Sequence, residues 1–167
     1  MKRNLFYTTF DTSAGWMGLI GSPVGLVCVT LPQSSEREAI HLLGNLEGAV
    51  AMPKHFQGVI ERFRSYFNGE IADFTDVLDL SVATPFQREV WQTARLIPYG
   101  ETRNYAWVAA RTGRPKAARA VGQALGINPY APHVPCHRVT ASDGSIGGYS
   151  GGLAKKKRLL RKEGVEI

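Results

Sequence analysis

Cysteine is scarce in this chain of 167 residues, which carries only Cys28 and Cys136. Two cysteines are too few for a disulfide framework or a cysteine-rich zinc site, so the composition favours a reducing intracellular compartment. Cys28 lies in the apolar run Leu26–Val29, which is typical of a buried strand, and we expect it to be inert packing.

Long apolar runs are also absent. No stretch approaches the roughly 20 residues that a membrane-spanning helix needs, and the first residues lack the apolar segment and cleavage site of a secretory signal. With 44% hydrophobic and 20% charged residues, the chain has the composition of an ordinary globular protein. We expect one domain or two small ones, and no membrane partner.

Acidic residues are few in the second half of the chain. Residues 1–80 carry 6 basic and 9 acidic side chains, a net charge of −3, whereas residues 81–167 carry 14 and 5, a net charge of +9. This asymmetry indicates that the second half faces a polyanion. A surface that is basic only for solubility is the alternative.

The first half predicts a small α/β domain over residues 1–80. Strand-like segments separated by turn residues come first, at Asn4–Phe10, Trp16–Ile20 and Val24–Leu31. Ser34–Leu43 is predicted to be a helix, because Ser35 and Glu38 have the spacing of a capping box. A second helix follows from an apolar repeat, and Val77–Val82 predicts one more strand.

A second domain is predicted over residues 81–167. Thr84 is a good N-cap, Pro85 fits the first helical position and Gln87 completes a capping box, so a helix begins here. Two more helices are expected, from the cap at Asn104 through Arg111 and over Lys116–Leu125.

A short turn containing glycine joins these last two helices, and the second is basic. This arrangement is typical of a helix-turn-helix, although many helical hairpins share it. Small side chains along Lys116–Leu125 let the backbone approach a nucleic-acid groove or a neighbouring helix closely. Arg119 stands out on this smooth surface as a long cationic probe, with a phosphate contact or a salt bridge as the simpler interpretation.

A thiol beside an imidazole follows this module. Cys136 lies between Pro135 and His137 in a stiff apolar run, Val134–Val139, which predicts a short buried strand or turn. A free thiol is only a few per cent thiolate near neutrality, and a basic partner raises that fraction. Taken alone, a buried structural cysteine is the simpler interpretation, and His137 shifts the balance toward a nucleophile.

Glu163 is the candidate acid for His137. It lies at helical spacing from Leu159 and Leu160, on or beside the apolar face of a C-terminal helix whose buried side also includes Leu153. A partly buried acid near a helix C-terminus requires a cationic or imidazole partner. A salt bridge to Arg158 or Lys162 of the same helix is the alternative. The exterior of this helix is predicted to carry Lys155, Lys156, Lys157, Arg158, Arg161 and Lys162.

Several ordered motifs together resemble the O6-alkylguanine-DNA alkyltransferase family. The resemblance runs from about Thr84 to Gly164, with a weaker match at Gly15–Ser22. Its motifs are Arg119-Ala120-Val121-Gly122, Asn128-Pro129, Pro135-Cys136-His137-Arg138-Val139, Gly148-Tyr149-Ser150-Gly151-Gly152-Leu153 and Leu159-Leu160-Arg161-Lys162-Glu163-Gly164.

The resemblance implies an α/β fold in which a ribonuclease H-like N-terminal domain precedes a winged helix-turn-helix domain. It implies a single-turnover repair protein that flips a damaged base out of double-stranded DNA. The alkyl group of O6-alkylguanine, with O4-alkylthymine as a further candidate substrate, would move irreversibly to Cys136. A monomer that binds the minor groove is expected, in the cytoplasm with the nucleoid or in a eukaryotic nucleus, with cooperative loading left open.

The resemblance also assigns roles to residues. Asn128 would brace the turn before Cys136, His137 polarised by Glu163 would accept the thiol proton, and Tyr105 would donate to the leaving guanine. Arg119 would replace the extruded nucleotide in the stack. The base would be held by Val139, Tyr149, Ser150 and Gly151, and DNA would be contacted by Lys116, Arg119, Ala120, Gly122 and Gln123.

Two alternative functions remain open on the sequence. One is a non-catalytic helix-turn-helix regulator with a structural Cys136, and the other is a thiol hydrolase that turns over. Some relatives bind zinc through cysteines of the N-terminal domain, but Cys28 stands alone there, so we expect neither a metal nor a cofactor. Asp73, Asp76 and Asp79 are interpreted as ordinary loop acids rather than as metal ligands.

Overall fold

The computed structural model describes residues 4–149 and 151–167. The chain forms two compact units, one of Met1–Ser81 with Pro129–His133 and the other of Val82–Asn128 with Val134–Ile167. The sequence placed all residues after position 80 in one domain. The return of Pro129–His133 to the first unit was not predicted, because tertiary packing rather than local sequence decides where such a segment lies.

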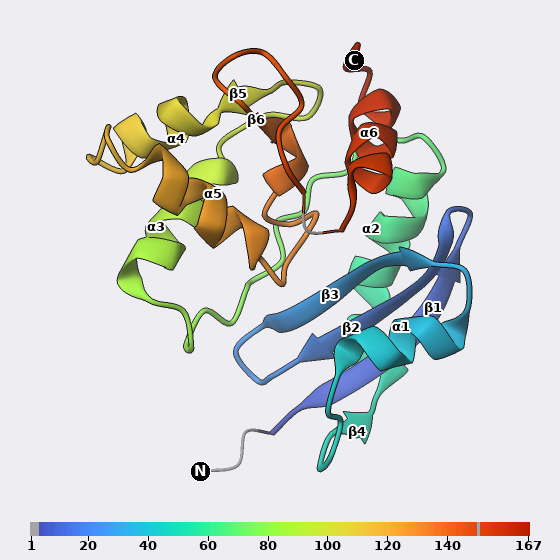
Figure 1. Ribbon diagram of the computed structural model, residues 1–167. Coiled ribbons are helices and arrows are strands. Elements are labelled where there is room, and N and C mark those ends of the chain that lie inside the picture. The colour runs from blue at the N-terminus through green and yellow to red at the C-terminus, as the bar shows by residue number, and fades with distance from the viewer. Residues whose placement is uncertain (1–3, 150) are drawn as a thin grey trace. The chain divides into compact units, whose positions relative to one another are not determined.

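A four-stranded sheet forms the centre of the first unit (Figure 1). The strands are β1 (Phe6–Thr12), β2 (Gly15–Gly21), β3 (Leu26–Gln33) and β4 (Val50–Ala51), in the order β3-β2-β1-β4, with β4 parallel to β1 and the other pairs antiparallel. The predicted strand at Val77–Val82 is wrong, since this segment makes only an isolated bridge from Leu78 to Leu26. Val77 and Val82 are exposed, so apolar character alone misled the prediction.

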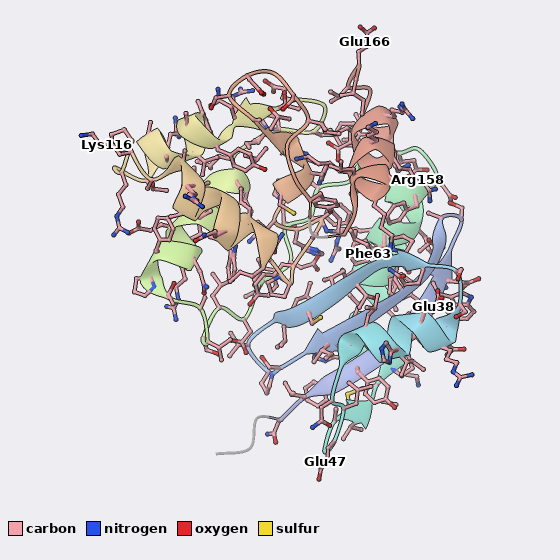
Figure 2. The ribbon with its side chains drawn as sticks, in the orientation of Figure 1. Glu38, Glu47, Phe63, Lys116, Arg158 and Glu166 are labelled. Carbon is pink, nitrogen blue, oxygen red and sulfur yellow. The ribbon has the colours of Figure 1, made fainter. Side chains whose placement is uncertain are left out.

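Two helices pack on opposite faces of this sheet: α1 (Glu36–Leu43) and α2 (Gln57–Phe67), the second preceded by a 3-10 turn, η1 (Pro53–Phe56). On the α1 face Gly18 leaves room for Leu43, whose side chain a Cβ at Gly18 would meet at 2.9 Å. On the other face Phe10 stacks on Phe63 of α2 with ring centroids 5.8 Å apart. Figure 2 labels Phe63. Ser35 caps α1 as predicted.

Helices dominate the second unit: α3 (Pro85–Ala94), α4 (Tyr105–Arg111), α5 (Ala118–Gly126) and α6 (Leu153–Lys162). A 3-10 turn, η2 (Cys136–Arg138), lies between α5 and α6, and β5 (Arg103–Asn104) pairs in parallel with β6 (Val139–Thr140). The capping box of Thr84 and Gln87 and the N-cap at Asn104 are confirmed.

Two predictions about these helices need correction. The helix predicted from Lys116 begins at Ala118, because Lys116 lies in a turn that the Ala117 amide closes on the Arg114 carbonyl. In α6, Leu153 is exposed rather than buried, and Lys156, expected on the exterior, is fully buried. Within the described part of the chain, no helix is long and apolar enough to cross a bilayer.

Candidate active site in the second unit

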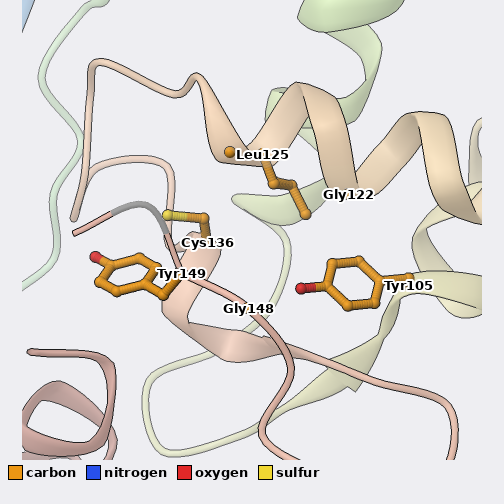
Figure 3. Close-up of a pocket in the computed structure, with 7 residues that line it drawn as sticks. Tyr105, Gly122, Leu125, Cys136, Gly148 and Tyr149 are labelled. Atoms are coloured by element: carbon orange, nitrogen blue, oxygen red, sulfur yellow. The ribbon is translucent and has the colours of Figure 1, made fainter. Parts of the chain in front are cut away.

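Cys136 opens the 3-10 turn η2, so the alternative of a turn rather than a strand is correct for this residue. Its amide donates to the Val134 carbonyl at 2.8 Å, which fixes the backbone just before the sulfur. The side chain is only 6% exposed, yet it lines a cavity of about 210 Å³. The other lining residues are Tyr105, Gly122, Leu125, Gly126, Gly148 and Tyr149 (Figure 3). The sulfur is thus buried but faces a space that a ligand can enter.

Asn128 connects the end of α5 to the nucleophile. Its Nδ2 donates to the Val134 carbonyl at 2.9 Å and contacts Cys136 Sγ at 3.4 Å. One side-chain amide group therefore braces the backbone of the turn and also donates a hydrogen bond to the sulfur. The predicted bracing position of Asn128 agrees with this geometry.

A buried carboxylate stands behind the turn. Glu163 Oε2 accepts a hydrogen bond from His137 Nε2 at 2.8 Å, and both side chains are fully buried. Arg138 donates to the same carboxylate, from Nε to Oε1 at 2.8 Å and from Nη2 to Oε2 at 3.1 Å. Glu163 therefore contacts His137 as predicted, and Arg138 is a further cationic partner. The sequence had given Arg138 no role.

Burial sets the protonation of the imidazole. It lowers the pKa of His137 below the ordinary value, although Glu163 opposes this effect, so the ring is neutral near pH 7. When Nε2–H donates to Glu163, the lone pair of Nδ1 is left as an acceptor. Nδ1 is buried and has no hydrogen-bond partner among the described residues. The neutral ring can therefore act as a base through Nδ1, while its Nε2–H group donates to the Glu163 carboxylate.

Burial also raises the pKa of the Cys136 thiol above its ordinary value. Asn128, the Tyr149 hydroxyl and the charge of Lys156 act in the opposite direction by stabilising the thiolate. The resting sulfur is thus a thiol rather than a preformed thiolate, and alkylation must be coupled to removal of its proton.

Lys156 is a second site residue, besides Arg138, to which the sequence analysis gave no role. Its ammonium group donates to the carbonyls of Val139 at 2.7 Å and Gly148 at 3.0 Å, and thereby ties α6 to β6 and to the loop between β6 and α6. Burial lowers the pKa of Lys156 to about 8. Its spacing of four residues from Leu160 and seven from Glu163 places it on the buried face of α6, a signal that was present in the sequence.

Tyr105 and Tyr149 approach the cavity from different elements (Figure 3). Tyr105, the first residue of α4, is half-buried, and burial raises the pKa of its phenol. The loop passes close beside it at Gly147, whose φ is +76° and whose Cβ, if present, would lie 3.1 Å from the Tyr105 hydroxyl. The phenolic groups therefore flank the space in front of the sulfur.

Two of the remaining predicted base-binding residues, Val139 and Gly151, do not line the cavity. Val139 is fully buried and does not line it, and its carbonyl accepts the Lys156 bond. Gly151 is exposed and is not among the lining residues. Ser150 lies outside the described residues.

The predicted DNA-contacting residues surround the start and the middle of α5. Lys116, Arg119 and Gln123 are exposed, and Figure 2 shows Lys116 projecting from the turn before the helix. Ala120 and Gly122 are half-buried, and Gly122 lines the cavity. The short helix α5 therefore presents the exposed Arg119 and also forms a wall of the thiol site.

Comparison with known proteins agrees with this arrangement. The family model described as 6-O-methylguanine DNA methyltransferase, DNA binding domain, matches residues 85–165. A methylated-DNA–protein-cysteine methyltransferase from Mycolicibacterium paratuberculosis is 42% identical over 158 residues, which are 94% of this chain and 91% of that protein. This chain belongs to the methylated-DNA–protein-cysteine methyltransferase family. The resemblance expected from the sequence is confirmed.

Solved structures of the family share the fold along nearly the whole chain. The enzyme of Mycobacterium tuberculosis in complex with DNA is 40% identical with a TM-score of 0.80, and the match covers 95% of this chain and 92% of that one. The O6-methylguanine DNA methyltransferase of Methanococcus jannaschii is 30% identical with a TM-score of 0.65, covering 96% and 95%. The predicted α/β fold class is therefore confirmed for this family member.

Proposed function

We propose that this protein repairs double-stranded DNA by transferring the alkyl group of O6-alkylguanine irreversibly to its own Cys136. One observation carries the proposal: the sulfur faces a cavity, and the adjacent His137 is bonded through Nε2 to buried Glu163. Family membership supplies the substrate class, since the relatives are named for methylated DNA and for a cysteine acceptor. The same chemistry extends to O4-alkylthymine and to alkyl groups larger than methyl.

The reaction is a displacement at carbon. His137 Nδ1 accepts the thiol proton, through a water where the distance requires one, and Glu163 stabilises the imidazolium that forms. The sulfur attacks the alkyl carbon, the S–C bond forms and the C–O6 bond breaks. Guanine leaves with the bonding electrons, and the Tyr105 hydroxyl donates a hydrogen bond or a proton to it. Because a thioether is not readily hydrolysed, each molecule acts once.

The substrate base must leave the duplex to reach a buried sulfur. Base flipping costs a few kcal/mol, less for a weakly paired lesion. We propose that α5 enters the minor groove, where its small residues permit close approach, and that Arg119 fills the space left in the stack. The flipped guanine would lie in the cavity between Tyr105 and Tyr149. These steps call on side chains of a single chain, so we propose a monomer.

Because DNA is the proposed substrate, the protein must work where the DNA of the cell lies. We propose that it is located in the cytoplasm of a prokaryotic cell, in association with the nucleoid, or in the nucleus of a eukaryotic cell.

Intact-protein mass spectrometry tests the proposal. The protein is incubated with duplex DNA that carries one O6-methylguanine, and we expect one added methyl group per molecule. Cys136→Ala should remain unmodified, whereas Cys28→Ser, which removes the other cysteine, should be methylated like the wild type.

Other outcomes distinguish the alternatives. An unmodified wild-type protein with an intact lesion would leave a DNA-binding regulator as the interpretation. Loss of more lesion than there is protein, without an adduct, would indicate a hydrolase.

A further inference from the structure

The chain passes from one unit to the other and back within a few residues of the nucleophile. Asn128 and Val134 belong to the unit that holds Cys136, whereas the five residues between them, Pro129–His133, pack with the first unit. This short segment, called here the crossing segment, is thus the covalent connection between the brace and the turn that carries the sulfur.

Three hydrogen bonds hold the crossing segment within the first unit. The Val29 amide donates to the Pro129 carbonyl at 2.8 Å, and the Tyr130 hydroxyl donates to the Asp79 carbonyl at 2.6 Å. At the far end, His133 Nε2 bonds Asp76 Oδ2 at 2.8 Å. Each bond fixes a different part of the segment.

The His133–Asp76 bond is itself well supported. The His133 side chain is fully buried and packs against the rings of Phe63 and Phe74, with centroid distances of 5.5 and 4.9 Å. Arg62 forms an ion pair with Asp76. Burial opposes ionisation of Asp76, but His133 and Arg62 outweigh it and hold the pKa of this carboxyl below its ordinary value. The acceptor is therefore a carboxylate of fixed orientation.

The next residue after His133 carries the backbone of the active site. The Val134 carbonyl accepts hydrogen bonds from Asn128 Nδ2 and from the Cys136 amide, and the same Asn128 group contacts the sulfur. A displacement of His133 is therefore transmitted through one peptide bond to the carbonyl that these two donors share. Misplacement of a reacting group by about 1 Å can cost roughly 100-fold in rate.

We propose that His133 and Asp76 are positioning residues for Cys136, fixing the Val134 carbonyl so that Asn128 and the thiol meet in the reactive geometry. The first unit thereby contributes to alkyl transfer through the crossing segment. In its application to DNA repair, this inference rests on the proposed function.

The decisive comparison is between two substitutions of one residue. His133→Gln can keep a donor near the position of Nε2, whereas His133→Leu fills the space but loses the bond. In single-turnover methyl transfer from duplex DNA, the amplitude reports the fraction of competent molecules and the rate constant reports positioning. We expect His133→Leu to lower the rate constant at least about 10-fold, and His133→Gln to recover most of it.

Two further variants separate positioning from loss of stability. Leu43→Ala removes packing between α1 and the sheet of the same unit and should lower thermal stability and amplitude while leaving the rate constant unchanged. Tyr130→Phe removes the hydroxyl group that donates to the Asp79 carbonyl. It should lower the rate constant of transfer, as His133→Leu does, but by a smaller factor. A rate constant in both His133→Leu and Tyr130→Phe within twofold of the wild type would overturn the inference.

A double substitution tests the route. If His133 acts through the carbonyl that Asn128 holds, adding His133→Leu to Asn128→Ala should slow transfer by much less than the product of the two single effects. Effects that multiply would show that the two residues act independently and would overturn the inference.

A second readout keeps the inference separate from the proposed function. Alkylation of Cys136 by iodoacetamide, resolved from Cys28 by peptide mass spectrometry, needs no DNA. If wild-type protein fails to accept methyl from DNA, the proposed function fails. The positioning inference then stands or falls on whether His133→Leu alters the iodoacetamide rate at Cys136 and His133→Gln restores it.

Discussion

At the scale of single residues, the buried carboxylate of Glu163 has several hydrogen-bond donors around it. It accepts from His137, from Nε and Nη2 of Arg138, and from the Gly100 amide at 3.4 Å. Such a group couples stability to chemistry, because its removal leaves Arg138 buried without its anion and His137 without its stabilising charge.

Glu163→Gln should therefore impair both properties. We expect alkyl transfer to slow by roughly 100-fold or more, since the imidazolium that receives the thiol proton loses its counter-charge. Stability should fall by about 3 kcal/mol, because a buried arginine loses its partner. Single-turnover kinetics and urea unfolding measure the two effects. Glu166→Gln, at an exposed acid near the end of the chain, is the control and should change neither.

Lys156 predicts a pH dependence of stability. Burial lowers its pKa from 10.5 to about 8 in the folded protein. Between these values the unfolded chain binds more protons than the folded one, so the stability contributed at this site rises as pH increases through the window. The free energy of unfolding of the wild type relative to Lys156→Met should therefore increase between about pH 8 and pH 10.

Urea unfolding at a series of pH values measures this difference. Lys157→Met, at the exposed neighbour on the same helix, should show no such trend. A wild-type advantage over Lys156→Met that stays constant across the window would contradict the assignment.

Residue-scale prediction succeeded where chemistry is local in sequence. Cys136 and His137 are adjacent, and Glu163 was found because helical spacing put an acid on an apolar face. Lys156 obeys the same spacing, but a run of basic residues concealed it, and only the carbonyls of Val139 and Gly148 explain its burial. Nothing in the sequence indicated that His133 meets Asp76, because 57 positions separate them.

At the scale of elements, α5 both presents an exposed cation, Arg119, and forms one wall of the cavity. Gly122 stands on the cavity side, where an added Cβ would meet the Tyr105 ring at an ordinary contact distance of 3.8 Å. Glycine inside a helix costs roughly 0.5–1 kcal/mol relative to alanine. Glycine at position 122 thus lowers the stability of the helix but leaves space in the cavity beside the sulfur.

Substitutions at Gly122 should reveal both effects. Gly122→Ala should raise stability by about 0.5–1 kcal/mol while slowing reaction with free O6-benzylguanine more than methyl transfer, because the bulkier substrate needs more of the cavity. Gly122→Leu should nearly abolish both reactions. Unfolding and single-turnover assays check the pair, and wild-type rates in Gly122→Leu would mean that the flipped base lies elsewhere.

Helix boundaries were predictable where a side chain caps its own helix. The side chains of Thr84, Asn104 and Ser35 each accept from the amide three residues ahead, so sequence alone located these starts. The start of α5 has no side-chain cap and was placed two residues early. The prediction of a strand at 77–82 was wrong for a related reason. Whether a segment pairs as a strand depends on a partner that is distant in sequence, and the segment itself does not reveal that partner.

At the scale of the whole molecule, charge is divided between the halves of the chain. Residues 81–167 carry 14 basic and 5 acidic side chains, and the first 80 carry 6 and 9. Affinity for duplex DNA should therefore depend strongly on salt and arise mainly from the second half, because each neutralised phosphate releases condensed counterions.

Arg119 and Lys116 should separate two contributions to DNA repair. Each change to alanine should reduce the slope of log affinity against log salt by about 1. Arg119→Ala should in addition slow repair of duplex DNA more than reaction with free O6-benzylguanine, since only the duplex requires extrusion of a base. Binding titrations at several salt concentrations and paired kinetics measure both effects.

Lys54→Ala, at an exposed cation of the first unit, should leave the slope and both rates unchanged. If Arg119→Ala lowers the reaction rates with duplex DNA and with free O6-benzylguanine by the same factor, Arg119 has no role in extrusion of the base.

The crossing segment has a consequence for dissecting the molecule by proteolysis. A single cleavage between Ser81 and Val82 severs the polypeptide at the unit boundary, yet the C-terminal fragment still includes five residues folded among the strands and helices of the N-terminal fragment. The nicked protein should therefore co-elute as one species under native conditions and separate only on denaturation. Two fragments expressed apart should reassociate when mixed, and their recovered alkyl-acceptor activity would report the docking of Pro129–His133.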